Sequence, residues 1–563
     1  MTPASLPVSV LPTTTFTPNT EAVGGSVVVS ALVALLPLLI FFVLLGVLRV
    51  RAHRAALGSL LVALVVAVLG FGMPAQLALL SATEGAAFGL FPILWIVLTA
   101  IWLYELTVVS GRMADVRATF SVVGRGDMRI QAMLIAFCFG GLLEALAGFG
   151  APVAITGAML VALGLPPIRA AVVVLVANTA PVAFGAMAIP VTTAGNLTGT
   201  PPEDIAAIIG HQTPLLALFV PTLLLFLVDG WRGVRQAWPV SLVTGLVFAV
   251  LQWWSSNHFS YELTDVVAAL GGFAAAVVML HWWRPVTPED QRSHATEPGA
   301  DLTPRRVVLG LLPYWLVVVV FAVGKLWTWG ADIPVALAGT DLLVQWPGLF
   351  GNLLTADGSP DGSAIYKLQW LSSPGTMLLL TGLVVSVVYA LTHEPGRPRV
   401  SVLDCLREFG RTVVRMRLPI VTICSVLALS YVMNQSGQTI TIGTWLAATG
   451  SLFAFLSPIL GWLGTAVTGS DTSANALFAK LQHTAGVTAG IDPDLLVAAN
   501  TSGGVVGKLI SPQNLTIAAT AIDQPGAETV LLRKVIGYSL GMLLILCILV
   551  YLQSTSVLGW MIG

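Results

Sequence analysis

Charge is scarce in this sequence. Of its 563 residues, only 9% are Asp, Glu, Lys or Arg, whereas 56% are hydrophobic. Soluble proteins normally carry about 25% charged residues, so this composition excludes an ordinary soluble enzyme or binding module. The formal net charge is −1, and without a basic excess there is no reason to expect a nucleic-acid partner.

Cysteine is also scarce, and its placement argues against two kinds of site. The four cysteines are scattered and form no CxxC pair: Cys138, Cys405, Cys424 and Cys547. We therefore expect no disulfide framework, no metal site and no cofactor. The N-terminal stretch before residue 26 carries one charge, Glu21. A cleaved signal needs a basic stretch before its apolar core, so we expect the first apolar segment to be retained.

The sequence is rich in long uncharged apolar runs. They include residues 27–48, 237–254, 266–283, 307–324, 377–392 and 535–553. About 20 apolar residues cross the hydrocarbon core of a bilayer as a helix, and a helix satisfies its own backbone hydrogen bonds in lipid. The sequence predicts an all-α polytopic membrane protein with roughly 12–14 membrane segments.

The positions of Lys and Arg predict the topology, because loops rich in them stay cytoplasmic. They gather near residues 49–54, 112–129, 232–235, 284–306, 397–417 and 533–534. Placing every cluster inside puts both termini outside. The predicted organisation has a polar external N-terminus (1–25), a first transmembrane repeat (26–283), a cytoplasmic linker (284–306) and a second transmembrane repeat (307–563) with an external loop (327–372).

The two halves share a motif that indicates a repeat. The first copy is Ala177, Asn178 and Thr179 with Gly185 and Pro190, and the second, at a constant offset, is Ala499, Asn500, Thr501, Gly507 and Pro512. The basic clusters orient the matched segments in opposite directions. The sequence therefore predicts two inverted-topology repeats, an architecture that serves alternating access in many secondary transporters.

Each half also contains two apolar segments that are dense in Gly and Pro, residues that interrupt a helix. We expect breaks in residues 137–163 at Gly140, Gly141, Gly148, Gly150 and Pro152, and in residues 170–191 at Pro181, Gly185 and Pro190. We expect further breaks in residues 461–481 around Gly469 to Thr472, and in residues 495–516 at Gly503, Gly504, Gly507 and Pro512. Such broken or re-entrant helices predict a substrate site near the middle of the membrane. The alternative is that the glycines only permit close helix packing.

Three ionisable residues lie deep in these segments: Glu144, Asp471 and Lys508. A buried charge costs about 2.5–3.5 kcal/mol on insertion scales, so one kept at this depth faces a pathway or a partner. We expect Glu144 or Asp471 to carry a coupling proton. Two alternatives stay open, a structural ion pair of Lys508 with one of the acids and a position at an exposed hairpin tip.

The substrate contacts are expected among polar side chains beside these charges. Ser470 and Thr472 flank Asp471 and can hydrogen-bond a carboxylate or hydroxyl ligand. Lys508 stands where the first repeat has Ala186, which indicates an anion contact. The matched motifs add Asn178, Thr179, Asn500 and Thr501, which either bind substrate or hold the broken backbone.

Longer stretches resemble the L-lactate permease family over nearly the whole chain. The most specific are residues 137–144 (FCFGGLLE), 147–156 (AGFGAPVAIT), 177–187 (ANTAPVAFGAM), 229–233 (DGWRG), 468–473 (TGSDTS) and 507–513 (GKLISPQ). The resemblance implies proton-coupled uptake of L-lactate, D-lactate and glycolate across a bacterial cytoplasmic membrane. The implied partners are a small 2-hydroxy monocarboxylate and the lipid bilayer, and the oligomeric state is not predicted.

Other functions remain open at this point. A weaker similarity of the two Ala-Asn-Thr motifs to the Ser-Asn-Thr motifs of sodium-coupled dicarboxylate carriers keeps a sodium-coupled carboxylate symporter in view. A cation/proton exchanger would use the same carboxylates and would not respond to lactate. A membrane-embedded enzyme would need a nucleophile–base pair or a metal cluster, and the sequence shows neither, so we expect no enzymatic activity.

Overall fold

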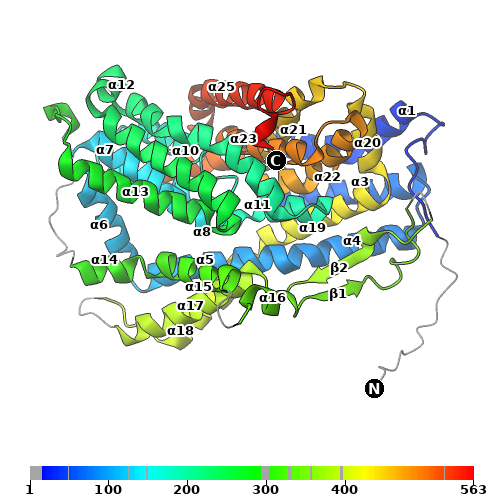
Figure 1. The fold of residues 1–563 in the computed structure, drawn as a ribbon, viewed down its shortest axis with the longest axis horizontal. Helices are drawn as coiled ribbons and strands as arrows, with labels where there is room; N and C mark the ends of the chain where they lie inside the picture. Colours follow the sequence, from blue (N-terminus) through cyan, green and yellow to red (C-terminus); the bar gives the residue numbers. More distant parts are fainter. Residues whose placement is uncertain are drawn as a thin grey trace. The chain divides into compact units, whose positions relative to one another are not determined.

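The computed structural model describes residues 15–48, 50–124, 126–147, 150–292, 303–327, 331–355, 358–392, 397–524 and 526–562. Helices dominate, and β1 (Leu342–Gln345) pairs with β2 (Ile365–Leu368) in an antiparallel hairpin within the segment predicted to be an external loop (Figure 1). The chain divides into two compact units. Unit 1 is Met1–Gly89, Leu342–Leu368 and Thr422–Trp445, and unit 2 is Leu90–Asp341, Gln369–Val421 and Leu446–Gly563.

Unit 1 is built on short apolar helices. They are α1 (Val27–Ala34), α2 (Leu36–Phe42), α3 (Ala52–Val65) and α4 (Ala75–Phe88), with most of α19 (Arg417–Gln435) and α20 (Gln438–Ala447) and the π-helical turns η1 (Val43–Val47) and η2 (Val66–Gly70). Helices α4 and α19 touch along their backbones, because a Cβ at Gly85 would lie 2.5 Å from the carbonyl oxygen of Leu427. Beside this contact, Gln435 donates a 2.9 Å hydrogen bond from Nε2 to the buried Glu84.

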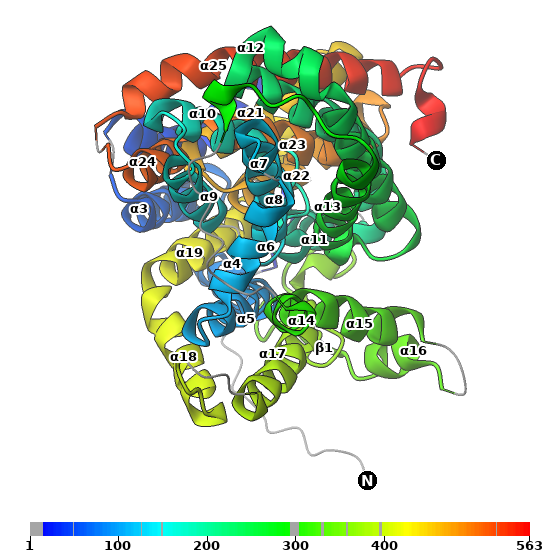
Figure 2. The same cartoon turned by 90° about the vertical axis from the view of Figure 1, so that its left-hand side faces the viewer.

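Unit 2 holds the remaining helices. In the first half of the chain they are α5 (Trp95–Val109), α6 (Met113–Val123), α7 (Met128–Met133), α8 (Gly140–Ala147), α9 (Ala151–Ala162), α10 (Pro167–Ala177), α11 (Gly185–Thr198), α12 (Pro202–His258) and α13 (Thr264–Trp282). The rest are α14 (Pro304–Gly310), α15 (Leu312–Leu326), α16 (Ile333–Ala338), α17 (Pro374–Leu391), α18 (Val402–Arg415), α21 (Leu452–Thr468), α22 (Asp471–Ala489), α23 (Pro493–Gly507), α24 (Pro512–Ala521) and α25 (Glu528–Gln553). Figures 1 and 2 show α12 beside α13, and Figure 2 shows α24 against α9.

Among the described residues, nine helices are long and apolar enough to cross a membrane, or up to ten if the bent pair of α14 and α15 forms one span. The prediction of an all-α polytopic membrane protein is thereby confirmed. The 57-residue α12 is counted once, although its backbone leaves the helical conformation at Asp229 and Gly230. Thr222 on one arm lies 3.0 Å from Ser241 on the other, so α12 is an antiparallel hairpin. Counting by length gives fewer segments than the expected 12–14 or so, because both arms of α12 are counted as one helix and the apolar helices of 10–17 residues are not counted.

The first of the four predicted broken segments, residues 137–163, is interrupted where α8 meets α9. Gly150 has a left-handed backbone with φ of 90°, while Gly148 lies outside the described residues. A Cβ on Gly140 would lie 3.7 Å from Cγ2 of Thr156, so α9 folds back along α8 as a helical hairpin. The expected break at Gly140 and Gly141 is wrong, because the π-helical turn η4 (Leu134–Phe139) passes into α8 as continuous helix.

The other three segments break close to their predicted positions. Helix α10 ends at Ala177 and α11 begins at Gly185. In the second half, Gly469 is left-handed with φ of 73° between α21 and α22, and Ser457 donates to Gln482 over 2.9 Å, so α22 returns along α21. The chain after α23 passes through the 3₁₀ turn η8 (Lys508–Ile510) into α24.

Gly503 and Gly504 are not helix breaks, which corrects the prediction from their sequence. Both lie inside α23, which runs on to Gly507. A Cβ at Gly503 would lie 2.0 Å from the carbonyl oxygen of Pro458 on α21. The packing alternative therefore holds at these two positions. The predicted domain boundaries, the inverted orientation of the repeats and the external position of both termini stay predictions.

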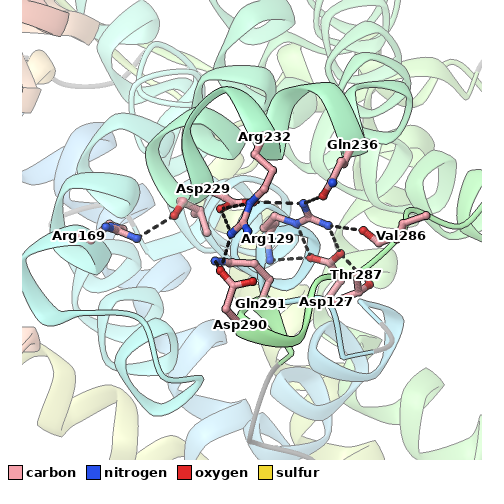
Figure 3. A network of polar contacts seen from close by, with 11 residues as sticks. Asp127, Arg129, Arg169, Asp229, Arg232, Gln236, Val286, Thr287, Asp290 and Gln291 are labelled. Atoms are coloured by element: carbon pink, nitrogen blue, oxygen red, sulfur yellow. Dashed lines mark hydrogen bonds and ion pairs between the residues drawn. The ribbon is translucent and has the colours of Figure 1, made fainter.

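A buried arginine joins three segments at one end of unit 2 (Figure 3). The Arg129 side chain is fully buried and pairs with Asp127 at 2.7 Å and with Asp229 of the α12 hairpin at 3.2 Å. It also donates to the backbone oxygen of Val286 over 3.0 Å. The described part of the predicted linker, residues 284–292, is therefore held in place by Arg129. Residues 293–302 lie outside the described residues.

The close contact of α21 with α23 predicts a large difference between two glycine substitutions. A Cβ at Gly461 would lie 1.8 Å from the carbonyl oxygen of Asn500, whereas nothing lies within 4 Å of a Cβ at Gly537 on α25. We expect Gly461→Ala to destabilise the fold by about 1–3 kcal/mol through overpacking, and Gly537→Ala to stabilise it by about 0.5–1 kcal/mol. Thermal unfolding of both purified variants tests this, and equal melting temperatures would contradict the backbone contact.

Candidate functional site

A small cavity of about 40 Å³ lies among the broken helices of unit 2. A cavity of this size has room for a few water molecules or one end of a small acid. It is lined by residues from α8, the start of α11, the junction of α21 with α22, and η8: Glu144, Val182, Gly185, Ala186, Pro190, Gly469, Ser470, Asp471, Thr472 and Lys508. Five of the residues predicted from sequence, Glu144, Ser470, Asp471, Thr472 and Lys508, thus line one space.

The central interaction of the cavity is a buried ion pair. Nζ of Lys508 lies 2.5 Å from Oε1 of Glu144, and the two side chains are 8% and 4% exposed. The other carboxylate oxygen, Oε2, accepts a 2.9 Å hydrogen bond from Nδ2 of Asn178. Each charge therefore has a partner, as a buried charge requires, and the pair joins the first half of the chain to the second.

Glu144 can reach this position because the facing backbone has no side chain. A Cβ at Gly185 would lie 2.9 Å from Oε1 of Glu144. Directly after it, Ala186, Met187 and Ala188 all have positive φ, between 45° and 59°. A left-handed backbone costs about 1–3 kcal/mol for each residue other than Gly and tends to occur at functional sites. Strain is thus concentrated at the wall of the cavity.

Asp471 faces the same cavity, and its carboxyl group has fewer hydrogen-bond partners than that of Glu144. It is the first residue of α22, where the positive end of the helix dipole favours a negative charge. Oδ1 accepts a 3.3 Å hydrogen bond from Thr465, while Oδ2 is buried without a partner among the described residues. The close approach again needs a glycine, since a Cβ at Gly504 would lie 1.9 Å from Oδ1.

With this geometry in view, the comparison with known proteins decides the family. The sequence model of the L-lactate permeases matches residues 30–557. The L-lactate permease of Bacillus subtilis (strain 168) is 41% identical over 96% of this chain and 98% of its own length. Two proteins of Escherichia coli (strain K12), the glycolate permease GlcA and the L-lactate permease, are each 38% identical over the same shares of the two chains.

The chain belongs to the L-lactate permease family. The resemblance seen in the sequence is confirmed, and with the apolar helices it makes this family member a multi-pass membrane protein. The family is one of permeases, which are transporters.

The remaining predicted site residues do not line the cavity. Asn500 and Thr501 are fully buried on α23, and both donate to Oδ1 of Asn475, over 3.1 and 2.9 Å. Thr179 donates to the carbonyl oxygen of Val176 over 2.7 Å. Asn500 and Thr501 thus join α23 to the side chain of Asn475 on α22, and Thr179 bonds the backbone of its own turn, whereas Asn178 contacts Glu144 directly.

Sequence reasoning missed a third buried carboxyl group near the site, Asp265, in the first turn of α13. Gln252 donates from Nε2 both to Oδ1 of Asp265, over 3.3 Å, and to the carbonyl oxygen of Ala180, over 3.1 Å. Ala180 belongs to the turn that carries Asn178, so Asp265 is linked through Gln252 to the Glu144 site. In the sequence Asp265 stands directly before an apolar run, as an ordinary acidic residue at the start of a helix does. Only its hydrogen bond with Gln252, in another helix, shows that it lies near the site.

The described residues contain no group of three or more His, Cys, Asp or Glu side chains placed to hold a metal ion. The polar side-chain groups that line the cavity are one ammonium, two carboxyl groups and two hydroxyl groups. The N-terminus of α22 adds backbone N–H groups at its wall. Such a set suits the binding of a small anion.

The ion pair predicts coupled effects on stability. Lys508→Met and Glu144→Gln should each lower the free energy of unfolding by about 3–5 kcal/mol, because each leaves one buried charge without its partner. The double variant should recover much of this loss, since it removes both charges. Chemical unfolding of the four proteins in one detergent measures the coupling energy.

The matched control for this cycle is Arg533→Met, which removes an exposed cation from α25. It should change stability by less than about 0.5 kcal/mol. Strictly additive losses in the Glu144→Gln and Lys508→Met variants would mean that the two residues do not act as a pair.

Proposed function

We propose that the protein imports a small 2-hydroxy monocarboxylate in symport with one proton, with L-lactate, D-lactate and glycolate as substrates. The observation that carries the proposal is the buried Lys508–Glu144 pair on a cavity that only a small molecule can enter. The relatives support the substrate class, since their names include L-lactate and glycolate permeases at 38–41% identity. No organic cofactor is needed, because the proton is the coupling ion.

The charges at the cavity give a physical reason for strict coupling. In the empty site Lys508 is neutralised by Glu144. When a substrate carboxylate takes the place of Glu144 at Lys508 and Glu144 binds a proton, the total charge of the site is the same as in the empty site, because Asp471 keeps its charge in both. A site that holds substrate alone carries an extra negative charge, and one that holds a proton alone carries an extra positive charge. Either charge is costly in the membrane interior, so only the empty and the fully loaded forms cross easily.

Glu144 is the better proton carrier of the two candidates. Its negative charge is stabilised by Lys508 and Asn178, and it loses the Lys508 contact when a substrate carboxylate binds there. Asp471 instead stands at a helix N-terminus, which stabilises its charge whether or not substrate is present. In this mechanism Ser470 and Thr472 receive the substrate hydroxyl, and the N–H groups at the start of α22 face its carboxylate.

Import against an inside-negative potential favours a neutral cargo. Moving one net negative charge inward costs about 2.3 kcal/mol per 100 mV, and the co-transported proton removes that cost. Alternating access would use the paired helical hairpins, α8 with α9 and α21 with α22, as equivalent elements of the predicted inverted repeats.

Uptake of labelled L-lactate into proteoliposomes tests the coupling ion. An inward proton gradient alone should drive accumulation, and a sodium gradient alone should not. Accumulation driven by sodium alone would favour the sodium-coupled symporter, whereas sodium-dependent pH changes without lactate uptake would indicate a cation/proton exchanger.

Three variants test the residue roles. Glu144→Gln should abolish gradient-driven accumulation but retain lactate exchange, because a neutral residue cannot release a proton yet leaves Lys508 free for substrate. Lys508→Ala should raise the apparent KM by about tenfold or more, since a charge-assisted hydrogen bond contributes about 1.5–3 kcal/mol. Asp471→Asn separates the candidates: loss of accumulation there, with normal accumulation in Glu144→Gln, would move the proton to Asp471.

A further inference from the structure

A second pocket of unit 2 lies on its surface, away from the substrate cavity. It is an open groove of about 480 Å³ where the start of α10, the turn of the α12 hairpin and the first turns of α25 meet. Its polar residues are Arg169, Lys534 and Tyr538, and its apolar walls include Ile168, Leu227 and Val530. Figure 2 shows α10 next to α25.

The two cations of the groove stand without acidic partners. No acidic residue lines the groove, and neither Arg169 nor Lys534 forms an ion pair with any described residue. Both side chains are exposed. The neighbouring arginines differ, because Arg129 and Arg232 are engaged by Asp127, Asp229 and Asp290. Arg169 and Lys534 therefore leave unpaired positive charge on the groove.

Arg169 is held in place. Its Nη1 donates a 2.9 Å hydrogen bond to the carbonyl oxygen of Val228, directly before the Asp229 turn (Figure 3). This contact uses one of the five N–H groups of the guanidinium and leaves the others for a ligand. A fixed guanidinium, an ammonium and a phenol on one groove match the oxygens of a phosphate group.

The surroundings of the groove indicate which phosphate compound it takes. The groove joins the predicted cytoplasmic clusters of residues 232–235 and 533–534, where the headgroups of the inner leaflet would lie. Its walls are apolar, and Ile545 and Ile548, which share the face of α25 that carries Lys534 and Tyr538, are 45% and 46% exposed, so an acyl chain can continue along that helix. A free anion would gain nothing from these apolar surfaces.

We propose that this groove binds the headgroup of an anionic phospholipid from the cytoplasmic leaflet, with its phosphate between Arg169 and Lys534. Basic pockets between membrane helices on the cytoplasmic side bind such headgroups in other proteins. The site lies one short helix away from the substrate cavity. Arg169 is the third residue of α10, and Asn178, which contacts Glu144, directly follows the end of this helix, about 14 Å from Arg169 at 1.5 Å per residue.

Native mass spectrometry of the full-length protein tests the proposal with short-chain phosphatidylglycerol as the probe and phosphatidylcholine as the neutral lipid. The wild type should retain phosphatidylglycerol preferentially. Each cation near the headgroups contributes about fivefold in affinity, so Arg169→Ala with Lys534→Ala should weaken retention by about 30-fold. Arg169→Lys should keep most of the binding, since the charge remains.

Arg533→Ala is the matched control, because it removes an exposed cation next to Lys534 that does not line the groove. It should leave the preference for phosphatidylglycerol unchanged, and a melting temperature close to that of the wild type should show that each variant is folded. Equal retention by the double variant and the wild type would overturn the proposal. Displacement of the lipid by millimolar inorganic phosphate would also overturn it, because the site would then take a free anion.

Discussion

The ion pair of Lys508 with Glu144 is the interaction on which the architecture of the site depends. Neither charge is tolerable alone at this depth, so two segments from opposite halves of the chain must meet within hydrogen-bonding distance. Gly185 gives the carboxylate its space, Asn178 occupies its second oxygen, and the backbone after Gly185 adopts a strained left-handed turn at the same place. The helix breaks are the means by which these groups reach one point.

The class of protein and most of the helix breaks could be predicted from the sequence, because both follow from local composition. Long uncharged runs predict membrane helices, and Gly469 and the residues after Ala177 and Gly507 do interrupt them. The same reasoning failed at Gly140 and at Gly503, which remain helical. A glycine that ends a helix and a glycine that lets a neighbouring helix approach can have the same residues around them in the sequence. Only the position of the neighbouring helix distinguishes the two cases, as Pro458 does for Gly503.

The candidate site could be predicted in part for a related reason. Glu144, Asp471 and Lys508 were visible as charges inside apolar segments, and Lys508 with Glu144 was one of the pairs considered. Asp265 cannot be recognised from the sequence, because an acidic residue in the first turn of a helix is ordinary, and only the fold shows that it is buried and bonded to Gln252. Similarly, Asn500 and Thr501 looked equivalent to Asn178 and Thr179, yet the helix continues past Asn500 and ends before Asn178. The two halves share a motif without sharing the role of each residue in it.

The glycines of α21 and α23 have a consequence for motion. Gly461, Gly503 and Gly507 each place the backbone of one helix against backbone of the other, so that a single added carbon would lie 1.8–2.3 Å from a main-chain oxygen. Helices in contact at this distance have no flexible side chains between them that could rearrange as the helices move. Sliding or pivoting at that interface would separate three main-chain contacts at once. Whatever conformational cycle the protein follows, α21 and α23 must travel as one rigid piece, and the hinges must lie in other parts of the chain.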